Sequence, residues 1–106
     1  MLAPDVAFIA AGRLPPGELP ESFPDLAPDL VVEIMSPSDS RPAAEAKART
    51  WIRLGARIVW IVDPRRRRIT IFERDHPSRM LSEADVLTGG AVLREFNCPV
   101  RRVFEV

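Results

Sequence analysis

An almost continuous apolar run, RIVWIVDP at residues 57–64, limits the possible folds of this chain more than any other segment. The run has the length of a strand, and its Asp-Pro pair marks a natural end. Apolar side chains along the whole run indicate a strand covered on both faces, as at the centre of a sheet packed with helices. A predicted strand at residues 29–35 and a predicted helix at residues 42–54 precede it. This order of strand, helix and strand implies a right-handed crossover between two parallel strands.

The helix is predicted by the spacing of its apolar residues. Ala44, Ala48 and Trp51 fall at i, i+4 and i+7 on one face, and Ile52 widens that face. A serine-rich turn with several possible caps precedes the segment, and Gly55 suits its carboxyl end. The segment is therefore expected to form an amphipathic helix.

The rest of the chain is expected to contribute strands and turns. Residues 4–10 predict a short strand, and the proline-rich residues 12–28 predict an irregular surface loop. The segment RITIFER, residues 68–74, is typical of a strand that forms a hairpin with the central run. Further short strands and turns are expected at Asp85 to Leu87, Gly89-Gly90, Ala91 to Leu93 and, at the carboxyl end, Val103-Phe104.

Length and composition fit one globular domain spanning residues 1–106. Hydrophobic residues make up 46% of the chain and charged residues 28%, an ordinary globular composition. No apolar run approaches the ~20 residues needed to span a bilayer, so no membrane association is expected. The amino end lacks the features of a secretory signal, so a cytoplasmic protein is expected. The single cysteine, Cys98, excludes an internal disulfide and a cysteine-based zinc site.

Arginine dominates the basic residues. The net charge is zero, so no overall field draws the chain to nucleic acid or to a membrane. Lys47 is the only lysine among the 15 basic residues. Arginine binds phosphates with two parallel hydrogen bonds, but a general compositional preference for Arg, Ala and Pro would give the same count. The consecutive residues Arg65 to Arg68 could contact phosphates or form a solvated hairpin tip, and the sequence leaves both possibilities open.

An acid, Glu33, lies inside the predicted strand at residues 29–35. In a strand, Glu33 shares one face with Val31 and Met35. The opposite face is entirely apolar and is the expected core face; its residues are Leu30, Val32 and Ile34. An ionised carboxylate among apolar neighbours is costly unless a cation, a metal or hydrogen-bond donors meet it. Glu33 is therefore either a site residue or an acid on an open sheet face that pairs with an arginine.

Asp5, Glu33 and Lys47 together are what a metal-dependent phosphodiesterase needs. Two carboxylates near strand ends can hold Mg²⁺, which polarises a phosphate and lowers the pKa of a bound water. A lysine can orient that water or stabilise charge in the transition state. The spacing is compatible with this site, although acids near strand ends are common in small α/β domains.

Five ordered segments resemble a known family. They are PDVAFI with Asp5, APDLVVEIMSPSDS with Glu33, the helical Lys47, GARIVWIVDP with its hairpin, and the terminal VLTGG-AVL segment. Together they cover nearly all of the chain and resemble the Uma2 family, a branch of the PD-(D/E)XK nuclease superfamily that is often labelled "putative restriction endonuclease". The resemblance implies an α/β fold with a restriction-endonuclease-like core: a mixed central β-sheet, a flanking helix and a C-terminal β-hairpin region.

The resemblance also implies an activity, endonucleolytic hydrolysis of phosphodiester bonds in nucleic acid, with DNA as the first candidate and Mg²⁺ (or Mn²⁺) as cofactor. Asp5 matches the family's first acid and Glu33 its second, so both are implied metal ligands and catalytic residues. The superfamily's usual lysine falls on Met35, which cannot replace it. Lys47 matches the helical lysine of Uma2-like sequences and is the third implied catalytic residue. Asp29 matches a second Pro-Asp of the family and could support the metal or merely begin the strand.

The chain departs from the family pattern at its amino end. Uma2-like chains usually have an N-terminal helix and hairpin before the first Pro-Asp strand, and this sequence begins just ahead of Asp5. The alternative function is therefore a catalytically inactive, shortened nuclease-like domain that binds nucleic acid or protein. A homodimer that completes the core and a fragment without independent function are further alternatives.

Overall fold

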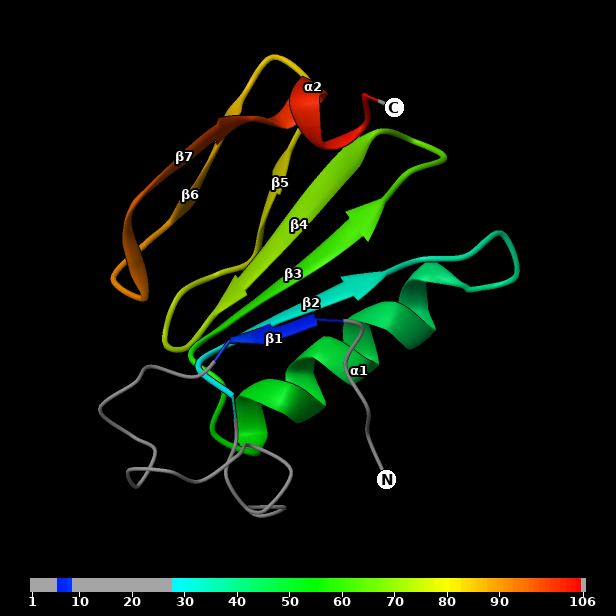
Figure 1. Ribbon diagram of the computed structural model, residues 1–106. Helices are drawn as coiled ribbons and strands as arrows, with labels where there is room; N and C mark the ends of the chain where they lie inside the picture. The colour runs from blue at the N-terminus through cyan, green and yellow to red at the C-terminus, as the bar shows by residue number, and fades with distance from the viewer. Residues whose placement is uncertain (1–5, 9–27, 106) are drawn as a thin grey trace.

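The computed structural model of the protein describes residues 6–8 and 28–105 (Figure 1). In chain order the elements are β1 (Val6–Phe8), β2 (Leu30–Ile34), α1 (Arg41–Arg53), β3 (Ile58–Asp63), β4 (Arg68–Glu73), β5 (Arg79–Leu81), β6 (Val86–Gly89), β7 (Leu93–Pro99) and α2 (Val100–Val103). No helix in these residues is long and apolar enough to cross a membrane.

The strands form one mixed sheet and one hairpin. The sheet has five strands in the order β1-β2-β3-β4-β5, and β6 pairs with β7 in a separate two-stranded sheet. β2 and β3 are parallel, with Val31 opposite Val59, whereas β1, β4 and β5 pair antiparallel with their neighbours. The predicted strand, helix, strand unit and the predicted β3–β4 hairpin are therefore confirmed.

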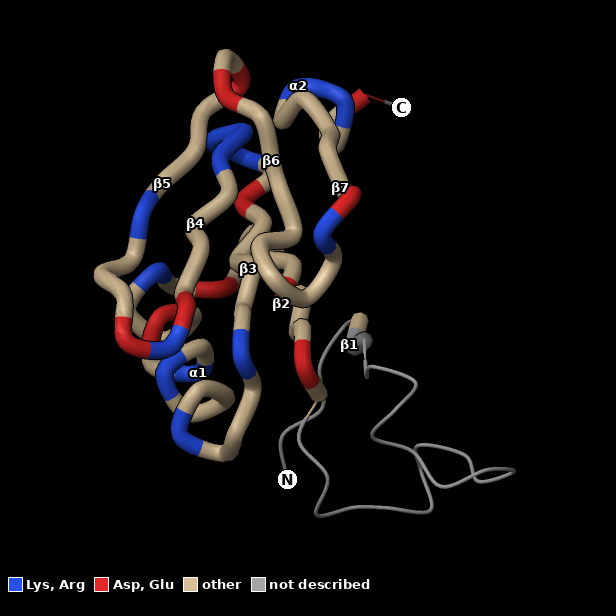
Figure 2. Tube along the Cα trace, turned by 90° about the vertical axis from the view of Figure 1, so that its left-hand side faces the viewer, with Lys and Arg blue, Asp and Glu red and all other residues tan. Residues whose placement is uncertain are grey.

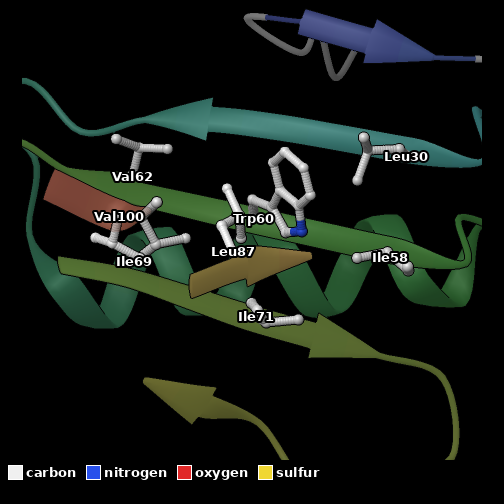
Figure 3. Packing of buried hydrophobic residues seen from close by; sticks show 8 residues of the cluster. All are labelled: Leu30, Ile58, Trp60, Val62, Ile69, Ile71, Leu87 and Val100. Carbon is white, nitrogen blue, oxygen red and sulfur yellow. The ribbon is translucent and has the colours of Figure 1, made fainter. Parts of the chain in front are cut away.

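Both faces of the sheet are covered, as the central apolar run predicts. All six residues of β3 are buried. On one face, α1 packs over a cluster formed by Val31, Met35, Ala48, Trp51, Ala56, Val59, Ile61 and Phe72. On the other face, β6 and α2 contribute to the cluster in Figure 3, formed by Leu30, Ile58, Trp60, Val62, Ile69, Ile71, Leu87 and Val100. The sheet is thus the middle layer of three.

Local sequence signals determine both ends of α1. The Ser40 side chain accepts a hydrogen bond from the backbone N–H of Ala43 at 3.2 Å, and a proline occupies the first turn. At the other end, Gly55 has a φ of 116°, a conformation that favours glycine. The predicted helix is confirmed with its boundaries shifted by one residue, and Ala48 and Trp51 are buried under it as its spacing predicts.

The prediction of which face of β2 is buried was only half right. Leu30 is buried, but Ile34 is 49% exposed, and Val31 and Met35 on the face of Glu33 are buried as well. The face that holds Glu33 is the one that α1 covers, so it is not an open sheet face. A period of two shows which side chains share a face, but it does not show what covers each face.

Two expectations near the carboxyl end were wrong. The strand predicted from residue 91 to residue 93 is instead the longer β7, which begins at Leu93, and the predicted terminal strand at Val103-Phe104 is replaced by α2 and a turn. Val100 and Phe104 both pack against the cluster in Figure 3. Their i, i+4 spacing places them on one side of a helical turn, but a strand would place them on one face as well, so the apolar pattern alone did not distinguish the two structures.

The amino-terminal expectations are only partly observable. The strand predicted at residues 4–10 is present over Val6–Phe8. Its remaining residues lie outside the described part of the chain, as does the loop predicted at residues 12–28 apart from Pro28.

We expect Ile61→Ala to lower the free energy of unfolding by about 2–5 kcal/mol, because Ile61 is fully buried in the central strand and its truncation leaves a cavity. The matched control is Ile34→Ala, the same change at the half-exposed end of β2, which should cost clearly less. Urea unfolding followed by circular dichroism measures both values. Equal losses would contradict the central position of β3.

Candidate active site

Glu33 is a buried acid whose two carboxylate oxygens both meet partners from α1. Glu33 is only 6% exposed. Trp51 donates its indole Nε1–H to Glu33 Oε1 at 2.9 Å, and Lys47 Nζ lies 3.2 Å from Glu33 Oε2. A neutral donor and a cation therefore compensate the carboxylate for its lost hydration.

The helix brings these two partners to Glu33 because of its period. Lys47 and Trp51 are four residues apart and so lie on the same side of α1, which packs against β2 and β3. The two side chains differ in exposure, since Trp51 is buried whereas the Lys47 side chain is 39% exposed. Lys47 is thus a partly exposed residue whose ammonium group contacts a buried carboxylate.

A hollow of about 200 Å³ opens beside this pair. It is lined by residues of β2, of the loop that follows it and of the first half of α1: Glu33, Ile34, Met35, Asp39, Ala43, Ala44 and Lys47. We call this hollow the Glu33 pocket. It places a carboxylate, an ammonium group and a second carboxylate around one small volume that is accessible from outside.

Asp39 is the acid of the Glu33 pocket that sequence reasoning missed. Its Oδ2 accepts a hydrogen bond from the backbone N–H of Ser36 at 2.7 Å. This backbone hydrogen bond, followed by a side-chain hydrogen bond from Ser36 and the charge of Lys47, lowers the pKa of Asp39 below its ordinary value of 3.8. The available signal was an acid in the turn directly after the strand of Glu33.

Two other buried acids serve different contacts. Asp29 lies at the start of β2, 3.9 Å from Arg57 Nη1, and its backbone carbonyl accepts from Arg57 and Ile58. Asp63 ends β3, and its Oδ2 is 3.3 Å from Arg66 Nη1. Neither residue lines the Glu33 pocket.

Of the three predicted site residues, the structure brings Glu33 and Lys47 together, whereas Asp5 lies outside the described residues. Val6, which follows Asp5 in the sequence, pairs with Val32, which precedes Glu33. Within the described part of the chain, no group of three or more His, Cys, Asp or Glu residues is arranged to hold a metal ion. The predicted metal role of Asp5 and Glu33 stays a prediction.

Comparison with protein families gives one match over most of the chain. The model of the Uma2 family, described as "Putative restriction endonuclease", matches residues 2–101. None of the curated proteins matches the chain.

Comparison with solved structures gives a fold. The chain is similar to "a putative nuclease belonging to DUF820" from Anabaena variabilis ATCC 29413, with a TM-score of 0.68 and 18% sequence identity. The match covers 74% of this chain and 45% of the other, so the chain spans less than half the length of that protein. The likeness confirms the predicted fold class, an α/β core with a mixed sheet, a flanking helix and a C-terminal hairpin.

We expect Trp51→Phe to destabilise the protein by about 1–3 kcal/mol more than Trp60→Phe, because removing the indole N–H leaves Glu33 Oε1 without its donor. Both tryptophans are almost fully buried, but Trp60 Nε1 has no hydrogen-bond partner within the described residues. The two substitutions therefore remove the same atoms, and Trp51→Phe alone of the two removes a hydrogen bond. Urea unfolding of both variants measures the difference, and equal losses would refute the importance of this bond.

We expect Asp39 to stabilise the fold at neutral pH and to lose this effect in acid. Because its pKa is lowered in the folded state, its contribution is present above the ordinary value of 3.8 and disappears as the pH falls through the lower folded-state value. The stability difference between the wild type and Asp39→Asn should therefore shrink from pH 6 toward pH 3. A difference that grows in acid, measured by urea unfolding, would contradict the assigned direction.

Proposed function

This chain belongs to the Uma2 family, and we propose that it is a metal-dependent endonuclease that hydrolyses phosphodiester bonds in nucleic acid, with DNA as the first candidate. The observation that carries the proposal is the pairing of Glu33 with Lys47 at the edge of an open pocket. Burying a carboxylate is costly even when it is paired, and here the partly exposed partner leaves a cation at the opening of the pocket, where an anionic substrate can reach it.

We assign Glu33 the role of a metal ligand. Its carboxylate is fixed by β2, by the indole of Trp51 and by the ammonium group of Lys47, so its position is defined before any ligand binds. A rigidly held ligand loses little conformational entropy on binding. Asp5, which directly precedes β1, is the proposed second ligand.

The donor set of the pocket fits a hard divalent cation. The carboxylates of Glu33 and Asp39 line it, and its lining includes no histidine or cysteine. Mg²⁺ and Mn²⁺ prefer oxygen ligands, and Mg²⁺ usually keeps several waters beside one or two carboxylates. When bound, such a cation polarises the phosphate and lowers the pKa of a coordinated water.

Lys47 is the proposed residue that stabilises charge on the reacting phosphate. Its ammonium group rests on Glu33 Oε2 and would compete with a cation for that oxygen. Because the side chain is 39% exposed, Lys47 can turn toward a phosphate oxygen in the pocket. A cation placed at developing negative charge stabilises the transition state.

We expect Glu33→Gln to reduce Mg²⁺-dependent cleavage of plasmid DNA on the order of 10²-fold or more, since it removes the charge of the proposed ligand. Asp5→Asn and Lys47→Met should reduce cleavage as well. The matched control is Glu45→Gln, because Glu45 is an acid on α1 that pairs with arginines but does not line the pocket. Gel assays with and without EDTA measure the cleavage, and circular dichroism checks the fold.

The same assay separates the enzyme from a binding module. Equal cleavage by the wild type and by Glu33→Gln would reject the proposed active site. A wild-type protein that binds DNA in a salt-sensitive way but does not cut it with Mg²⁺ or Mn²⁺ would identify a nucleic-acid-binding module instead.

A further inference from the structure

A second hollow adjoins the Glu33 pocket at the carboxyl ends of β2 and β3. It measures about 390 Å³ and is lined by the loop after β2 and by the β3–β4 turn, through Met35, Ser36, Pro37, Asp39, Asp63, Pro64, Arg65 and Arg66. Met35 and Asp39 line both hollows. Figure 1 shows that the loop and the turn lie at the same end of the sheet. The two hollows are therefore neighbours that share Met35 and Asp39, and we call them together the groove.

The four consecutive arginines separate into two pairs with different surroundings. Arg67 Nε lies 2.9 Å from Glu83 Oε1, and the Arg67 guanidinium stacks on the ring of Phe104. Arg68 donates from Nη1 to Met80 Sδ at 3.2 Å. Only Arg65 and Arg66 line the second hollow. Arg67 and Arg68 are thus directed away from this hollow, whereas Arg65 and Arg66 line it. Figure 2 shows the run as a basic segment at the β3–β4 turn.

Arg65 and Arg66 differ in how they are held. The buried carboxylate of Asp63 accepts the backbone N–H of Arg66 on Oδ1 at 3.2 Å and the guanidinium Nη1 on Oδ2 at 3.3 Å. Arg66 is therefore oriented, and about half of its side chain remains exposed. Arg65 is exposed and makes no ion pair or side-chain hydrogen bond with the described part of the chain. One oriented and one uncommitted guanidinium suit a ligand with successive anionic groups.

We propose that Arg65 and Arg66 bind the phosphates on one side of the cleaved bond, so that a nucleic-acid strand runs from the Glu33 pocket past Asp39 to the β3–β4 turn. This inference rests on the proposed nuclease function. A strand carries one negative charge per about 3.4 Å of helix axis, so a strand cut beside Glu33 must present further phosphates nearby. Because the chain has no net charge, contacts to phosphates depend on local cations such as this pair.

A further hollow of the described chain that is lined by arginines is less suited to this role. It measures about 370 Å³ and lies between the end of α1 and the residues after β4. Its arginines already have partners, since Arg49 stacks on Phe72 and Arg74 donates to the Ile52 carbonyl at 2.6 Å. This hollow shares no lining residue with the Glu33 pocket, so a bound strand would not be continuous with the proposed active site.

The test compares two double variants of the full chain that each remove two positive charges. Arg65→Gln/Arg66→Gln alters the groove, whereas the control Arg79→Gln/Arg94→Gln alters exposed arginines on β5 and β7 that do not line it. Fluorescence anisotropy with a labelled oligonucleotide gives the dissociation constant at several salt concentrations. We expect the groove variant to bind more weakly and to lower the slope of log K against log salt by about 1.5, the value for two lost phosphate contacts. The control should keep the wild-type slope.

The outcomes separate this inference from the proposed function. The proposed role of Arg65 and Arg66 would be refuted if the groove variant keeps the wild-type slope, or if the control variant loses as much slope. If the wild type still cleaves DNA with Mg²⁺, the proposed nuclease function stands in either case. A wild type without cleavage would instead refute the nuclease. If losing the Asp63 contact unfolds the double variant, as judged by circular dichroism, Arg65→Gln alone should lower the slope by about 0.8. If Arg65 and Arg66 bind substrate, their replacement by glutamine should raise KM more than it lowers kcat.

Discussion

A carboxylate buried beneath a helix is the constraint on which the site depends. Glu33 faces α1 rather than solvent, so its charge must be met within the protein. Lys47 and Trp51 meet it from successive turns of that helix. The position of α1 over the sheet and the chemistry of Glu33 are therefore coupled, because a helix rotated away would leave a buried charge without partners.

The parallel pairing of β2 and β3 determines which segments lie next to Glu33. Parallel strands end at the same edge of a sheet, so the loop after β2 and the turn after β3 are neighbours. The loop contributes Asp39 and the turn contributes Arg65 and Arg66, next to the pocket of Glu33. A rigid, fully buried β3 supports these exposed segments, as is usual where functional loops are carried by a packed scaffold.

Charge in this protein has to be considered locally rather than as a sum. Acidic and basic residues cancel over the chain, yet the arginines of the β3–β4 turn face different surroundings. Glu83 and Phe104 engage Arg67, whereas Arg65 has no such contact within the described residues. A neutral chain can therefore present a local cationic surface, because screening limits each charge to a range of roughly 10 Å.

The sequence alone determined the central strand, the amphipathic α1 with its caps, the parallel β2–β3 unit and the identity of Glu33 and Lys47 as candidates. These follow from periodicity, capping residues and resemblance, all of which are local or ordered along the chain. Only the tertiary structure decided that Glu33 lies on the covered face, that Trp51 is its hydrogen-bond donor, that Asp39 shares its pocket and that α2 replaces a terminal strand. Each of these depends on which distant segment packs against a given face. A one-dimensional pattern carries no information about that contact until the chain has folded.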